Sequence, residues 1–133
     1  MKYEKLIESA KNAMKNAYSP YSGFKVGAAL LCKDATTYDG CNIENASYGA
    51  TCCAERTAIF QAIKDGKRHF SAICIVGGKE DSINDFCYPC GICRQVMSEF
   101  CDGEFEIVLF NGTEEKVIKL SEMLPYSFSG DLL

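Results

Sequence analysis

The sequence predicts an α/β fold in which a mixed five-stranded sheet carries helices on its faces. Apolar spacing changes along the chain between helical and strand-like, and the segments follow the order α β β α β α β β. Strands separated by a helix can run parallel, which makes the expected sheet mixed. No repeat, low-complexity tract or linker interrupts the 133 residues, so we expect a single domain over residues 1–133.

Four elements are expected in the first half of the chain. Residues 3–17 place apolar side chains at helical spacing with Lys and Glu between them, which predicts an amphipathic helix over one sheet face. Residues 25–32 are a nearly continuous apolar run, and residues 36–43 follow it after a short polar break, so the two are expected to form adjacent strands. The spacing becomes helical again over residues 52–65, and Gly66 stands at the helix stop.

Four more elements are expected in the second half. Residues 70–76 have the composition of a buried strand, closed by Gly77 and Gly78. A third helix is indicated further on by Ile92, Val96 and Phe100. The last two strands, 106–110 and 116–120, flank an Asn-Gly turn.

Composition excludes several classes of protein. There are 14 Lys and Arg against 18 Asp and Glu, for a net charge of −4. A protein that binds nucleic acid mainly through its phosphate backbone is therefore not expected. The N-terminal residues lack the apolar core of a signal peptide, and no apolar run is long enough to span a membrane. We therefore expect a cytoplasmic protein, where the nine cysteines stay reduced and a cysteine cluster indicates metal or catalysis.

Three cysteines stand where helices are expected to begin. Cys53 opens the second helix, and Cys90 and Cys93 open the third, in the sequence Pro-Cys-Gly-Ile-Cys. Backbone N–H groups and the positive end of the helix macrodipole favour thiolates at such positions. The set predicts a zinc site with three sulfur ligands, which leaves one coordination position open, as in catalytic rather than structural zinc sites.

Two charged residues follow Cys53 directly. Residues i and i+2 of a helix point about 200° apart, so Cys53 and Glu55 can face one metal only if Cys53 is a cap with non-helical backbone. Glu55 is then placed to take a proton from a metal-bound water and deliver it to a substrate. Arg56 is expected to face the sulfurs and offset their negative charge.

Other interpretations of the cysteines stay open at this point. Cys52 and Cys87 could instead join Cys90 and Cys93 in a closed four-sulfur structural zinc site, which would leave Glu55 without a role. Cys90 and Cys93 could instead form a redox dithiol. Core packing is the better interpretation for Cys32, Cys41, Cys74 and Cys101.

Four segments together resemble the small zinc-dependent cytidine deaminases, whose Cys/His-x-Glu and Pro-Cys-x-x-Cys signature they contain. They are YSPYSGFKVGAA at 18–29, GCNIENA at 40–46, CAERT at 53–57 and PCGICRQ at 89–95. They lie between residues 18 and 95, in the order and spacing of that family. The resemblance implies a three-layer α-β-α sandwich and hydrolytic deamination of cytidine and deoxycytidine, a step of pyrimidine salvage.

The same resemblance implies roles for individual residues. One zinc per chain would be held by the three cysteines, and the hydroxide on it would attack C4 of the ring while Glu55 protonates N3 and later the leaving amine. Phe24 looks like the residue that packs on the pyrimidine, and Asn42 and Glu44 look like the partners of the ribose 3′-hydroxyl. Ala54 would contact the base through its backbone. Phe128 looks like a contact from a neighbouring chain.

The implied partners are a small-molecule nucleoside and further copies of the chain. The family is similar in forming homotetramers with shared active sites, and neither nucleic acid nor membrane is expected as a partner. A related deaminase for another aminopyrimidine nucleoside, of the blasticidin type, is the alternative enzyme, although the Asn42-Ile43-Glu44 segment favours ordinary ribose.

Overall fold

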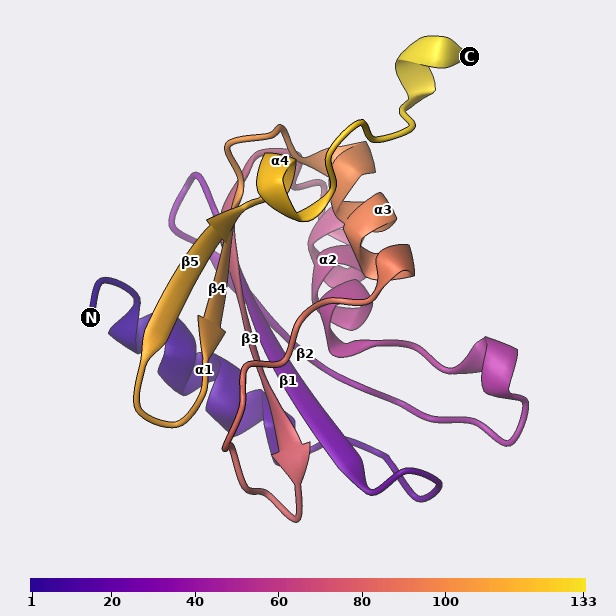
Figure 1. Cartoon of the computed structure of the whole chain (residues 1–133). Coiled ribbons are helices and arrows are strands. Elements are labelled where there is room, and N and C mark those ends of the chain that lie inside the picture. Colours follow the sequence, from indigo (N-terminus) through magenta and orange to yellow (C-terminus); the bar gives the residue numbers. More distant parts are fainter.

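The computed structural model describes residues 1–133, and its five strands form one mixed sheet (Figure 1). The strands are β1 (Phe24–Cys32), β2 (Thr37–Cys41), β3 (Phe70–Lys79), β4 (Glu106–Phe110) and β5 (Glu115–Lys119). They lie in the order β2-β1-β3-β4-β5. β3 and β4 run parallel and the other neighbours run antiparallel, so the expected mixed sheet is confirmed.

Helices cover both faces of this sheet, which confirms the expected layers. They are α1 (Glu4–Met14), α2 (Ala54–Lys64), α3 (Gly91–Phe100) and the short α4 (Leu120–Met123), with single 3₁₀ turns at Tyr48–Ala50 and Gly130–Leu132. Figure 1 shows α1 on one side of the strands and α2 and α3 together on the other. No helix of the chain has the length and apolarity that crossing a membrane requires.

Strand β3 explains how one sheet has two cores. Its side chains alternate between the faces, as the pleat of a strand requires. Ala72, Cys74 and Val76 belong to the cluster beneath α1, whereas Ile73 and Ile75 belong to the larger cluster beneath α2 and α3. A strand that is buried on both faces reads as the continuous apolar run seen in the sequence.

The contact between β2 and α2 is unusually close at Gly40. A Cβ at this position would lie 2.4 Å from the Ala54 carbonyl oxygen and 2.5 Å from the Ala58 nitrogen, both in the backbone of α2. Only glycine permits that approach. Because Cys53 is the N-cap of α2, this contact also helps to position the backbone of Cys53.

Several element boundaries differ from those expected, among them the end of β2 at Cys41 rather than at residue 43. Strand β3 continues through Gly77 and Gly78 to Lys79, because both glycines keep their pairing with β1. Other residues of the same chain fill the space that a side chain would occupy: a Cβ on Gly77 would meet Cys87 and Phe24. Helix α1 ends at Met14 rather than at residue 17, and Leu120 begins α4 instead of ending the last strand.

Candidate active site

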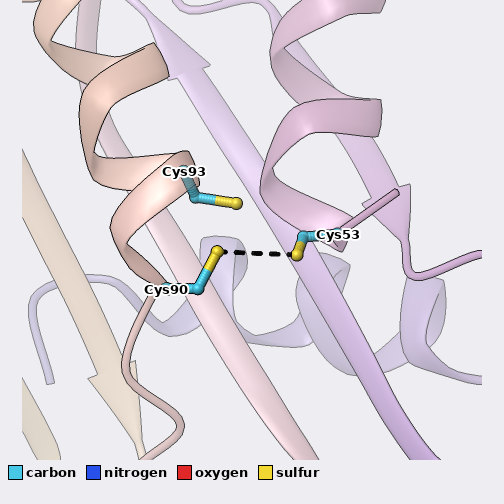
Figure 2. A group of neighbouring side chains, drawn as sticks. All are labelled: Cys53, Cys90 and Cys93. Atoms are coloured by element: carbon cyan, nitrogen blue, oxygen red, sulfur yellow. Dashed lines mark hydrogen bonds between the residues drawn. The ribbon is translucent and has the colours of Figure 1, made fainter. Parts of the chain in front are cut away.

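The three cysteines singled out by the sequence meet at one point. Figure 2 shows the side chains of Cys90 and Cys93, from the start of α3, facing that of Cys53 at the start of α2. Their sulfur atoms all lie within 4.8 Å of one another, and the sulfurs of Cys53 and Cys90 are 3.8 Å apart. A tetrahedral zinc with Zn–S bonds of about 2.3 Å holds its sulfurs about 3.8 Å apart. The cluster therefore fits one zinc ion per chain.

Helix caps give the cluster its shape. Cys53 is the N-cap of α2, with φ −73° and ψ 156°, and Cys90 is the N-cap of α3, with φ −69° and ψ 168°. Both have the extended backbone that Cys53 needs in order to share a site with Glu55, so the two side chains are not held 200° apart by a continuous helix. Two positive helix ends point at the sulfurs and stabilise negative charge on them.

The sulfurs compete with one another for ionisation. A hydrogen bond from Cys93, with others from Arg56 and Cys90, lowers the pKa of Cys53 to about 5, although burial opposes this. The same hydrogen bond and burial raise the pKa of Cys93 well above its ordinary value. Like charges at this spacing oppose each other, so three thiolates need a divalent cation among them.

Arg56 lies beside the cluster, as expected. Its Nη2 donates to the sulfur of Cys53 at 3.5 Å and to the carbonyl oxygen of Thr51 at 3.4 Å. Three thiolates around a dication carry an excess negative charge, which one guanidinium balances. The Nε of Arg56 is buried without a hydrogen-bond partner.

Glu55 is buried in the first turn of α2, with only 4% of its surface exposed. Burial raises the pKa of its carboxyl to about 7, and the charge of Cys53 acts in the same direction. Its own backbone N–H, Cys93 and Arg56 act against them. A carboxyl of this kind can both accept and release a proton near neutral pH.

The alternative zinc ligands lie outside the cluster. Neither Cys52 nor Cys87 belongs to the group of sulfurs within 4.8 Å of one another. Cys87 instead lines a hollow together with Phe24 and Gly77. The geometry favours a three-sulfur site over a closed four-sulfur one.

The two residues expected to bind ribose are already held by the chain. The side chain of Asn42 accepts from Val26 N and donates to Phe24 O, both at 2.8 Å, which leaves one amide hydrogen free. The carboxylate of Glu44 accepts from the N–H groups of Tyr21 and Ser22 at 2.9 and 3.1 Å, and from the Ser22 hydroxyl. Both side chains are thereby fixed in orientation.

The remaining expected contacts are spread over the chain. Phe24 is 36% exposed, and its hollow is separate from the one that Glu44 shares with Tyr48 and Thr51. Ala54 is fully buried in the first turn of α2. Phe128 is 57% exposed on the C-terminal segment, which leaves the body of the molecule beyond α4 (Figure 1).

Sequence reasoning missed Arg94, which lies next to the ligand Cys93. Its guanidinium donates to the carbonyl oxygens of Pro89 and Met123, both at 2.8 Å. Its position four residues after Cys90, one helical turn, was the available signal. No local sequence pattern indicates the contact with Met123, which is 29 residues away.

Comparison with known proteins identifies this arrangement. Residues 1–109 match the family model described as the cytidine and deoxycytidylate deaminase zinc-binding region. The chain is 48% identical to a cytidine deaminase of Sporosarcina psychrophila over 132 residues, covering 97% of this chain and 93% of that one. It is 46% identical to a cytidine deaminase of Halalkalibacterium halodurans over 132 residues, covering 98% and 97%. The crystal structure of a cytidine deaminase from Burkholderia pseudomallei superposes with a TM-score of 0.88 at 46% identity, covering 96% of this chain and all of that one.

Proposed function

The chain belongs to the cytidine deaminase family of zinc enzymes, and from this premise we propose how its residues carry out the reaction. Cytidine is hydrolysed to uridine and ammonia, with one zinc ion per chain as cofactor. Deoxycytidine is proposed as a second substrate, giving deoxyuridine, because the ribose contacts assigned below reach the 3′-hydroxyl, which both nucleosides have.

One observation carries the mechanism: the buried Glu55 lies two residues from Cys53, at the same helix N-terminus as the sulfur cluster. Zinc bound by the three sulfurs supplies Lewis acidity, which makes water nucleophilic near neutral pH. Glu55 would take one proton from a water molecule and give it to N3 of the ring as the oxygen adds to C4. It would then take the remaining proton of that oxygen and pass it to the amine, which leaves as ammonia. General acid–base catalysis of this kind contributes typically about 10² to 10⁴ in rate.

Substrate contacts are assigned to residues whose positions are fixed by the fold. Phe24 packs on the pyrimidine, the backbone of Ala54 contacts the base, and Asn42 and Glu44 bind the 3′-hydroxyl. A base without sugar would leave the free amide hydrogen of Asn42 without a partner and the carboxylate of Glu44 without its additional donor. A loss of that kind lowers kcat/KM by factors that reach about 10⁴ to 10⁵. Free cytosine is therefore a poor substrate.

An ultraviolet assay with purified, zinc-loaded protein tests the proposal. Cytidine and deoxycytidine should lose the cytosine absorbance and yield the uracil products, while free cytosine reacts far more slowly. Blasticidin S, the substrate of the alternative deaminase, belongs in the same experiment. Turnover of blasticidin S without turnover of cytidine would replace this proposal with that alternative.

The assembly and the compartment are part of the same proposal. We propose a homotetramer with shared active sites, in which Phe128 reaches a neighbouring chain. Support comes from large apolar side chains left exposed on the single chain, among them Ile92 at 62% and Phe60 at 47%. Sedimentation equilibrium measures the assembly, and a monomer at assay concentration would refute it. The nine free cysteines support a reducing compartment, the cytoplasm.

A further inference from the structure

Cys90 is the least supported of the three ligands. Cys93 is fully buried within the larger core cluster, and Cys53 is half-buried and packs against that cluster. Cys90 is exposed and belongs to neither core cluster. Tyr88 and Ile92, two positions before and after it, are 46% and 62% exposed, and of its two immediate neighbours only Pro89 is buried. Packing therefore does little to hold the sulfur of Cys90 in place.

Arg94 binds both peptide units that flank the Cα of Cys90. Its backbone N–H donates to the Cys90 carbonyl oxygen at 3.0 Å, and its Nε donates to the Pro89 carbonyl oxygen at 2.8 Å. Rotation about φ of Cys90 would move the Pro89 carbonyl relative to the Cys90 carbonyl, as would rotation about ψ. One residue therefore restrains both backbone torsions of Cys90, and these set the direction of its Cα–Cβ bond.

The guanidinium of Arg94 is itself held by a hydrogen bond to α4. Its Nη1 donates at 2.8 Å to the carbonyl oxygen of Met123, the last residue of α4. Leu120 and Met123 of α4 are buried in the same cluster as Cys93. Hydrogen bonds from a charged donor are among the stronger ones, and the planar guanidinium keeps its two donors in fixed relation.

We propose that Arg94 is the positioning residue of the zinc ligand Cys90, which it connects through Pro89 and Met123 to the buried core. The proposal rests on the zinc site of the proposed function and not on the identity of the substrate. Removal of partners that orient a metal ligand typically weakens metal binding by about 10- to 100-fold. We expect a loss in this range when the guanidinium is removed.

The experiment compares zinc affinities by competition with a chromophoric chelator in the full-length protein. Arg94→Met keeps the aliphatic stem and removes the donors, so its zinc affinity should fall by about 10- to 100-fold. Arg94→Lys keeps a charge that can reach one carbonyl, so its loss should be smaller. Arg68→Met is the matched control, because Arg68 also donates to two backbone carbonyls, at the distant end of α2, and should match the wild type.

Cobalt substitution separates ligand positioning from simple stabilisation. The thiolate-to-cobalt charge-transfer band grows with the number of sulfur ligands, so in Arg94→Met its intensity per bound cobalt should fall as Cys90 leaves the ligand set. A folded Arg94→Met with wild-type zinc affinity and a wild-type band overturns the proposal. If Arg94→Met does not fold, Arg94→Lys decides by the same two measurements. Wild-type protein without zinc affinity would instead refute the proposed function and this inference together.

Discussion

Replacement of Gly40 by alanine is expected to weaken zinc binding, although Gly40 is not itself a ligand. The new Cβ would lie 2.4 Å from the Ala54 carbonyl oxygen and 2.5 Å from the Ala58 nitrogen, whereas ordinary contact begins at 3.4 Å. The first turn of α2 must therefore move away from β2 by roughly 1 Å to restore normal contact. Cys53 moves with its helix, and metal sites accept ligand distances only within about 0.2 Å of the ideal.

Two measurements check this expectation. Overpacking of this kind costs about 1 to 3 kcal/mol, and each kcal/mol lowers Tm by about 4 °C in a chain of this length. Thermal unfolding and the zinc content after dialysis should therefore both fall in Gly40→Ala. Gly49→Ala is the matched control, because nothing lies within 4 Å of its added Cβ. Equal zinc content and equal Tm in the two variants would refute the reasoning.

Glu55→Gln should keep its zinc and lose about 10² to 10⁴ in kcat, measured by loss of cytosine absorbance; a wild-type kcat would remove Glu55 from the mechanism. Cys93→Ala should lose zinc to a mild chelator, whereas Cys74→Ala, at an equally buried cysteine of the other cluster, should keep it. Burial, together with Glu106, raises the pKa of Tyr3 to about 12, so the fold favours the neutral phenol. The contribution of neutral Tyr3 to the free energy of unfolding is complete below the ordinary pKa near 10 and is lost as the pH rises towards 12. Denaturant unfolding should therefore show the wild type losing free energy in this window relative to Tyr3→Phe, and identical pH slopes in both proteins would contradict the assignment.

The sulfur cluster could be predicted from sequence because its determinants are local. Cys53, Cys90 and Cys93 each stand at the first turn of a helix whose apolar spacing is plain in the sequence. A layered α/β fold then brings two helix ends on the same sheet face together. The cap conformation of Cys53 also followed from local geometry, since only a non-helical residue there can share a site with Glu55.

Features that depend on distant partners could not be predicted in the same way. Gly77 and Gly78 have the composition of a strand end, yet β1 pairs with both, so the strand continues. Arg94 looks like a surface residue of an amphipathic helix until Met123 comes into contact with it. The two hydrogen bonds that hold the Asn42 side chain depend on the path of β1 beside it. Long-range packing overrides local pattern at each of these positions.

The sulfur cluster also joins two parts of the chain that are far apart in sequence. Cys53 and Cys90 are 37 positions apart, and α2, β3 and the loop before α3 lie between them. An ion bound by both cysteines links the two ends of this loop in the folded protein, and because the unfolded chain lacks the preformed site, the binding free energy stabilises the fold. A covalent cross-link over a loop of comparable length stabilises a fold by about 3 to 5 kcal/mol in the chain-entropy description. A chelator therefore acts on this protein as a reducing agent acts on a disulfide-bonded one: it opens a loop as well as emptying a site.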